Sequence, residues 1–352
     1  MVSTGSEMRN NSKTYDWSYV LGQIAAGNDL TEQESKDVLT QVLNGQAQDA
    51  QLGALLLALK TKGESPLELL GFSDAMVEAS NQIKLADNVI DVVGTGGSKQ
   101  GRGSALNTST MASFVVAAAG AKVCKHGNRK ATSTSGSFDF LERLGVNLNQ
   151  NSEDIEQSVE QLNLGFVYAK SFHPAMRFAG PVRSQLGVPT VFNLLGPLSH
   201  PGRVKKLLLG AANLATAELL AEVLMAKGVT GWVVNGSDGL DELTLNGATN
   251  IFEVSEGEVK QSQIHSEQFG LSSRSEPVLG GDSSANLAIF ESILKGDSSP
   301  QRDLVVYNSA AGLVVAGVCN DLADAIALAE ECIDSGKVNE LKNRYIKICG
   351  NK

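Results

Sequence analysis

Glycine, hydroxyl and basic side chains gather in short polar segments within residues 94–137. The first segment follows an apolar, strand-like stretch at 89–93 and reads Gly94-Thr95-Gly96-Gly97. Glycine has no Cβ and can adopt a positive φ, so neighbouring backbone N–H groups can approach an anion closely. A glycine-rich turn after a strand is also where α/β enzymes bind phosphate. We therefore predict an anion site here, with a plain tight turn as the alternative.

The second segment stands at the start of a predicted helix. Thr108, Ser109 and Thr110 precede an apolar run that Gly120 ends, and we expect their hydroxyls to be N-caps. The open N–H groups of this helix would add partial positive charge. Lys125, at the end of the next apolar run, supplies a full charge. Together these features predict a phosphate site more strongly than the glycine turn does alone.

Seven motifs occur in the order found in the anthranilate phosphoribosyltransferases, a family that carries out an early step of tryptophan biosynthesis. The chain resembles this family over about residues 15–350, nearly its whole length. The motifs are GTGG at 94–97, NTST at 107–110, KHGNR at 125–129, SGS at 135–137, PVR at 181–183, FNLLGPL at 192–198 and GLDELT at 239–244. Many separated motifs in one order are far more specific than any single one.

The resemblance implies a transfer reaction with two substrates. In the family, the amine of anthranilate attacks C1 of phosphoribosyl pyrophosphate (PRPP), and pyrophosphate leaves through an oxocarbenium-like state. The difficulty lies in stabilising a departing polyanion and in aligning the two reactants. Electrostatics and positioning should therefore matter more than a strong base.

The donor site implied by the resemblance contains the glycine turn, the helix start and two residues beyond them. The turn would bind pyrophosphate through backbone N–H groups, and the hydroxyls would bind phosphate oxygens. The implied donor-binding residues are Gly94, Thr95, Gly96, Gly97, Ser98, Asn107, Ser109, Thr110, Lys125 and Ser137.

A metal site is expected at Asp241 and Glu242, two adjacent carboxylates in a glycine-rich turn. Mg²⁺ is a hard ion that prefers oxygen ligands and shares them with phosphates. The resemblance implies that these acids, with Ser109, bind Mg²⁺. Considered without the family, the pair is more typical of a solvated loop.

The resemblance implies that anthranilate is bound by Asn128, His126, His173, Arg183 and Pro197. A planar guanidinium such as that of Arg183 can bind a carboxylate through two parallel hydrogen bonds. Asn128 would bind the carboxylate or the amine and hold the nucleophile in line. His126 is a candidate proton acceptor, with a structural histidine as the alternative. We expect no chemical role for the two other histidines, His200 and His265.

The chain departs from the family pattern beside the glycine turn. The family usually has Asp at the position of Ser98, and the following loop at 99–103 is longer than usual and carries Lys99 and Arg102. A lost carboxylate and added positive charge should favour pyrophosphate binding and weaken metal binding. His200 also replaces the usual Asn.

The periodicity predicts an α/β fold with a small all-helical domain and a larger α/β domain, whose mainly parallel central sheet is flanked by helices. Residues 14–87 have a helical pattern: Thr31 should cap a helix that runs to Asn44, and a dense Ala/Leu helix at 50–60 should end near Gly63. Residues 1–13 are polar and are interpreted as a disordered leader.

After residue 88 the pattern changes to short β-branched runs that alternate with helices. Strands are predicted at 89–93, 121–124, 165–168, 206–209 and 231–234, and helices at 108–119, 138–144, 153–162, 215–227 and 322–335. The family returns about 173–200 to the helical domain. The donor-binding α/β domain would then comprise 88–172 and 201–352.

A leucine-rich face at 52–59 exceeds what a small helical unit needs for its own core. The resemblance implies a homodimer formed through the helical domain, and burial of this face against a partner subunit would fit. Packing within the same chain is the alternative.

Composition excludes several classes of function. The net charge of −10 gives no general field that would attract nucleic acid. No run approaches the about 20 apolar residues needed to cross a bilayer. The four cysteines are far apart and lack metal-ligand spacing, as expected for reduced thiols in the cytoplasm.

Three alternatives to the transferase remain open. A related transferase would accept another aromatic acid, and a panel of acceptors would distinguish it. A pyrimidine-type nucleoside phosphorylase shares this architecture, but the KHGNR and Asp-Glu motifs argue against it. A catalytically weakened binding paralogue is supported only by Ser98 and the longer loop.

Overall fold

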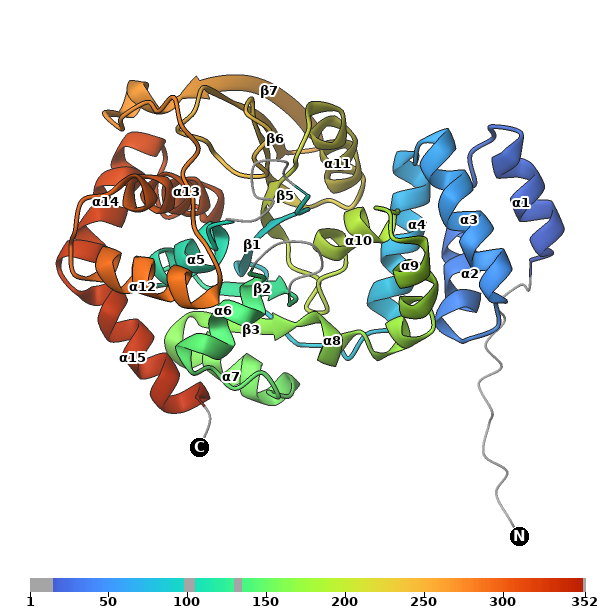
Figure 1. Ribbon diagram of the computed structural model, residues 1–352, viewed down its shortest axis with the longest axis horizontal. Helices are drawn as coiled ribbons and strands as arrows, with labels where there is room; N and C mark the ends of the chain where they lie inside the picture. Colours follow the sequence, from blue (N-terminus) through green and yellow to red (C-terminus); the bar gives the residue numbers. More distant parts are fainter. Residues whose placement is uncertain (1–14, 98–104, 130–134, 351–352) are drawn as a thin grey trace, which may run out of the picture.

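A computed structural model describes residues 15–97, 105–129 and 135–350. Seven strands form one sheet in the order β3-β2-β1-β4-β5-β6-β7 (Figure 1). The strands are β1 (Ile90–Gly94), β2 (Val123–Gly127), β3 (Leu164–Tyr168), β4 (Lys206–Gly210), β5 (Thr230–Gly236), β6 (Ala248–Ser255) and β7 (Glu258–His265). Strands β1 to β5 pair in parallel, and β6 and β7 are antiparallel. The predicted α/β class with a mainly parallel sheet is confirmed.

Alternating side chains of the central strands point to opposite faces of the sheet, as the two-residue period of a strand requires. On β4, Leu208 joins one apolar cluster, while Leu207 and Leu209 join another. The first cluster contains residues from α5 (Thr108–Ala118), α12 (Ser283–Leu294), α13 (Pro300–Ala316), α14 (Leu322–Asp334) and α15 (Lys337–Cys349). The second contains α11 (Leu214–Ala226) and the N-terminal helices. Helices therefore cover both faces of the sheet.

The predicted helices are present, and so are several elements that the sequence pattern did not predict. Helices α6 (Ser137–Leu144) and α7 (Ser152–Leu162) match predicted segments, as do α5, α11 and α14. Strands β6 and β7 and helices α12, α13 and α15 were not predicted. Helix α13 is buried on nearly all sides, so it lacks the polar face that marks an amphipathic helix.

The N-terminal helices lie together at one end of the molecule (Figure 1). They are α1 (Trp17–Ala25), α2 (Glu32–Leu43), α3 (Asp49–Lys62) and α4 (Pro66–Glu78). Thr31 caps α2 through a capping box with Glu34, the helix ends at Asn44, and Gly63 ends α3, as predicted. Helices α9 (Gly180–Leu186) and α10 (Phe192–Leu198) contact α3 and α4, so this segment packs beside helices far from it in sequence.

The leucine-rich face of α3 packs within the chain. Leu52, Leu55, Leu56 and Leu59 are all buried in the cluster shared by the N-terminal helices, α9 and α10. Only Leu57 is exposed, with 53% of its surface accessible. Intramolecular packing, the alternative interpretation of this face, therefore accounts for all of these leucines except Leu57.

No helix in the three described ranges is both long and apolar enough to span a membrane. The four cysteines are free thiols: Cys124, Cys332 and Cys349 are buried, and Cys319 is partly so.

Candidate functional site

The glycine turn and the acidic turn meet at the carboxyl ends of β1, β4 and β5. The N–H of Gly96 donates to Asp241 Oδ2 at 2.7 Å, although the two residues are 145 positions apart. Gly94 and Gly210 allow this approach: a Cβ on Gly94 would lie 2.3 Å from Asp241 Oδ2, and one on Gly210 would lie 1.6 Å from the Asp241 carbonyl oxygen. Larger residues at these positions would therefore displace the acidic turn.

Hydrogen bonds fix the acidic turn between β5 and β6. The Leu243 N–H donates to Asn308 Oδ1 on α13 at 2.9 Å, and the Thr244 hydroxyl donates to Asp238 Oδ2 at 2.7 Å. The Thr108 hydroxyl, at the start of α5, donates to Glu242 Oε1 at 3.1 Å. The turn and the helix start are thus joined directly.

The two adjacent carboxylates are suited to binding a cation. Burial raises the pKa of Asp241, and burial together with the Asp241 charge raises the pKa of Glu242 to about 8. Within the described ranges, no group of three or more His, Cys, Asp or Glu side chains could hold a metal by itself. The donor set therefore fits a hard ion that takes its other ligands from hydroxyl, water or phosphate oxygens.

The hydroxyls at the start of α5 do not cap the helix, contrary to our prediction. Asn107 is at the N-cap position, and no described side chain there accepts a capping hydrogen bond. Its side chain instead exchanges hydrogen bonds with Ser135, at 3.0 and 3.4 Å. Among the described residues, no hydrogen bond is formed by the N–H of Thr108 or Ser109. These N–H groups can bind an anion, as can the buried Thr110 hydroxyl, which has no hydrogen-bond partner within 15–97, 105–129 and 135–350.

Lys125 and Ser137 lie near the same end of the sheet. Lys125 on β2 is buried, and its ammonium donates to the Val92 carbonyl of β1. Burial lowers the pKa of Lys125, and the nearby carboxylates of Asp91, Asp241 and Glu242 oppose that shift. The Ser137 hydroxyl donates to the Asn128 carbonyl at 3.2 Å and thereby joins two of the predicted site segments. Ser98 and the 99–103 loop lie outside the described residues.

Three buried histidines cluster between β2 and the segment that carries α10. The ring centre of His126 lies 5.2 Å from that of His173 and 5.7 Å from that of His200. His126 Nδ1 lies 3.2 Å from the Gly196 carbonyl, which can only accept, so Nδ1 carries the proton and Nε2 is basic. Nε2 is buried and has no hydrogen-bond partner in the described part of the chain. Burial lowers the pKa of His126 well below its usual value.

His200 differs from His126 in its hydrogen bonding. His200 Nδ1 accepts from the Gly202 N–H at 2.9 Å, so its Nε2–H donates to the Cys124 carbonyl at 3.0 Å. Both ring nitrogens of His200 are therefore used in holding the chain. Burial lowers the pKa of His173 and of His200 to about 4, so both are neutral at pH 7.

Arg183 is a cation without a carboxylate partner in the described part of the chain. It lies on α9, and its guanidinium carbon is 4.9 Å from the centre of the Phe192 ring on α10. Burial lowers its pKa. Pro197 is buried within α10, one residue after the carbonyl that binds His126. Asn128 is exposed at the end of β2, where its Oδ1 accepts from the Arg129 N–H at 2.8 Å.

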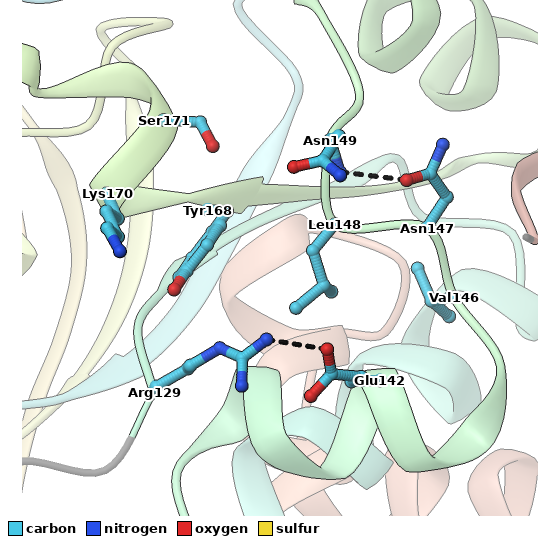
Figure 2. A pocket seen from close by; sticks show the side chains of 9 residues that line it. All are labelled: Arg129, Glu142, Val146, Asn147, Leu148, Asn149, Tyr168, Lys170 and Ser171. Carbon is cyan, nitrogen blue, oxygen red and sulfur yellow. Dashed lines mark hydrogen bonds and ion pairs between the residues drawn. The ribbon is translucent and has the colours of Figure 1, made fainter.

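A cavity of about 520 Å³ lies beside this arrangement, at the ends of β2 and β3 (Figure 2). Arg129 and Glu142 form an ion pair across it at 2.6 Å. None of the predicted site residues that the structure describes lines it; the lining residues are Arg129, Glu142, Val146, Asn147, Leu148, Asn149, Tyr168, Lys170 and Ser171.

One buried residue of the site region was missed by the sequence analysis. Asp91 is the second residue of β1, and its carboxylate accepts from the His126 N–H at 3.2 Å. An acidic residue inside an otherwise apolar strand was the available signal.

Comparisons with known proteins agree over most of the chain. The model of the glycosyl transferase family, a/b domain, matches residues 86–339, and that of the glycosyl transferase family, helical bundle domain, matches 18–80. The chain is 40% identical to an anthranilate phosphoribosyltransferase from Rhodococcus jostii over 94% of its length and 93% of the relative's.

Two solved structures have the same fold. The anthranilate phosphoribosyltransferase of Thermus thermophilus has a TM-score of 0.87 and 38% identity, with 94% of this chain and 98% of the other covered. The Saccharomyces cerevisiae enzyme in complex with PRPP and Mg has a TM-score of 0.86 and 26% identity, with 95% and 97% covered.

Proposed function

Because the chain belongs to the anthranilate phosphoribosyltransferase family, we propose that it transfers the phosphoribosyl group of PRPP to the amine of anthranilate. The products are N-(5-phosphoribosyl)anthranilate and pyrophosphate. The amine nitrogen forms a bond to C1 as the bond between C1 and the diphosphate oxygen breaks. One proton must then leave the nitrogen.

The observation that carries this proposal is the hydrogen bond from Gly96 N–H to the Asp241 carboxylate, at 2.7 Å. The Gly96 N–H binds a negatively charged oxygen in this structure, which supports its use as an anion-binding group. It also contacts an acid pair that is suited to a metal. The nearby N–H groups of Thr108 and Ser109 lie at the start of α5, where the helix dipole favours negative charge. The donor diphosphate would lie between these groups, with Lys125 and Ser137 at its edge.

Mg²⁺ is the cofactor that the acidic turn best supports, with Asp241, Glu242 and Ser109 as its protein ligands. Bound there, it would neutralise negative charge on the diphosphate. The raised pKa of Glu242 supports this assignment, because a partly buried pair of like charges is stabilised by a cation.

His126 and Arg183 have complementary tasks at the acceptor. Arg183 lacks a carboxylate partner in the described ranges, so it is available for the carboxylate of anthranilate. His126 Nε2 is available for the proton that the amine loses, and its tautomer is set by Gly196. A weak base is sufficient because an aryl ammonium is acidic. Asn128, His173 and Pro197 would complete the acceptor site.

Replacing Arg183 with Ala should raise the KM for anthranilate about 10- to 100-fold, since hydrogen bonds to charged groups contribute about 1.5–3 kcal/mol. Turnover at saturating anthranilate should change less. Loss of anthranilate fluorescence with PRPP and Mg²⁺ measures both quantities. The matched control is Arg177→Ala, because Arg177 also stacks on an aromatic ring, that of Phe178, but is exposed. Equal effects of the two substitutions would contradict the role of Arg183.

A homodimer is also proposed, formed through the helical domain. Exposed Leu57 on α3 lines a largely apolar groove of about 400 Å³ with Ile24 and Ala25 of α1. An apolar groove of this kind supports contact with a second copy. We further propose that 14–87 with 173–200 form the helical domain and that 88–172 with 201–352 form the donor-binding domain. Free thiols support a cytoplasmic location.

A further inference from the structure

Strands β1 and β2 are neighbours in the sheet but pair at a single position. Their register contains only Ile90 opposite Val123. By contrast, β1 pairs with β4 at five positions, and β2 pairs with β3 at five. The hydrogen-bond ladder between β1 and β2 therefore stops early, although the two strands stay side by side up to the glycine turn and the KHGNR segment.

Two ionisable side chains join β1 and β2 in opposite directions. Asp91 of β1 accepts a hydrogen bond from the His126 N–H of β2, at 3.2 Å. Lys125 of β2 donates to the Val92 carbonyl of β1. Asp91 thus binds the main chain of the residue after Lys125, and Lys125 binds the main chain of the residue after Asp91. These two hydrogen bonds join the strands where the ladder between β1 and β2 has stopped.

Both side chains are buried at a considerable energetic penalty. Asp91 is 0% exposed and Lys125 is 2% exposed. Asp91 Oδ2 has no hydrogen-bond partner, and Asp91 forms no ion pair, among the residues that the structure describes. A buried carboxylate with an unbonded oxygen is destabilising, so it is poorly explained by the needs of folding. A neutral Asn would accept the same N–H without a buried charge.

The charge of Lys125 would explain why position 91 carries a carboxylate and not a neutral amide. Burial raises the pKa of Asp91 to about 7, and the charge of Lys125 opposes that shift; Cys124 is another titratable side chain near Asp91. Of the carboxylates that favour the ammonium form of Lys125, Asp91 acts most strongly, ahead of Asp241 and Glu242. Those two acids are the proposed metal ligands, and their charge would be neutralised by Mg²⁺. Asp91 would then be the remaining counter-charge for Lys125.

We propose that Asp91 is a positioning residue for the donor site, which supplies the counter-charge of Lys125 and holds the carboxyl end of β2 so that the ammonium can bind the diphosphate. This inference rests on the proposed donor role of Lys125. Asp91 does not touch the substrate; it acts through Lys125.

A double-mutant cycle tests the inference. Asp91→Asn should raise the KM for PRPP about tenfold, with a smaller change in kcat, and Lys125→Gln should raise it at least as much. The variant with both substitutions should be no worse than Lys125→Gln alone, because Asp91 then has nothing left to act through. Initial rates from the anthranilate fluorescence assay, with PRPP varied, give these constants.

Two controls separate positioning from a structural role. The KM for anthranilate and the thermal unfolding temperature should change little in Asp91→Asn, and Asp37→Asn, at a buried carboxylate on α2, should leave the KM for PRPP unchanged. Asp91→Ser is made in parallel, so that a folded neutral variant is obtained if the Asn variant is unstable.

The outcomes distinguish this inference from the proposed function. Additive effects of the two substitutions, or an Asp91→Asn variant whose only defect is lower stability, would overturn the role of Asp91 alone. An unchanged KM for PRPP in Lys125→Gln would overturn the donor role of Lys125 and, with it, that of Asp91.

Discussion

Changing Asp241 to Asn and Glu242 to Gln together is expected to lower turnover by about a hundredfold or more, which corresponds to about 2.7 kcal/mol of transition-state stabilisation. Both amides retain the size of the acids but lose the charge that would hold Mg²⁺. The Mg²⁺ concentration required for half-maximal rate should also rise. The anthranilate fluorescence assay with varied Mg²⁺ measures both effects.

The pH dependence sharpens this prediction. With the pKa of Glu242 raised to about 8, the carboxyl group must release a proton before it can bind a cation at neutral pH. The apparent affinity for Mg²⁺ should therefore increase as the pH rises toward about 8 and then level off. Glu242→Gln alone should remove most of this dependence.

A remote pair of adjacent acids provides the matched control. Glu330 and Glu331 on α14 can be changed to Gln with the same loss of charge. Their replacement should leave turnover and the Mg²⁺ requirement unchanged. If the control and the site variant lower turnover equally, the acidic turn is not the metal site.

The second large effect concerns stability: Glu68→Ala should lower the free energy of unfolding by about 3–5 kcal/mol. Glu68 is 0% exposed, and its carboxylate accepts from the Leu30 N–H at 3.0 Å, the Ser65 N–H at 2.8 Å and the Lys62 ammonium at 2.9 Å. Truncation leaves two N–H groups and a largely buried ammonium without this partner. Urea denaturation followed by circular dichroism measures the loss.

Glu34 is the matched control for Glu68. Both occupy the third position of a capping box, Glu34 in α2 and Glu68 in α4, but Glu34 lies in an exposed hydrogen bond with Thr31. Glu34→Ala should therefore lower the free energy of unfolding by only about 1 kcal/mol. Similar losses in the two variants would mean that the buried bonds of Glu68 contribute nothing beyond capping.

The elements that the sequence predicted well have strong local signals. Thr31, Gly63 and Gly120 mark helix ends through their own chemistry, and each lies at or beside the predicted boundary. The β6–β7 hairpin was missed because β7 is an exposed edge strand, with polar side chains on most positions. Gly257 was the available signal in the sequence, because the turn needs a positive φ, which Glu256 and Gly257 both adopt.

For the site, the sequence indicated which residues carry chemistry but not how they contact one another. The glycine turn and Asp241 were both predicted, and the structure brings them into contact across 145 residues. The tautomer of His126 depends on the Gly196 carbonyl, from a segment remote in sequence. The bridging of β1 and β2 by Asp91 and Lys125 depends on where the hydrogen-bond ladder between the two strands stops. Such features arise from tertiary packing, so local patterns carry little information about them.

A crystal structure of the protein with PRPP and Mg²⁺ tests the central claim most directly. We expect the diphosphate within hydrogen-bond distance of the Gly96 or Ser109 N–H, and the metal bound to Asp241 or Glu242. A diphosphate bound instead in the cavity between Arg129 and Lys170, with the acidic turn unchanged, would contradict the account.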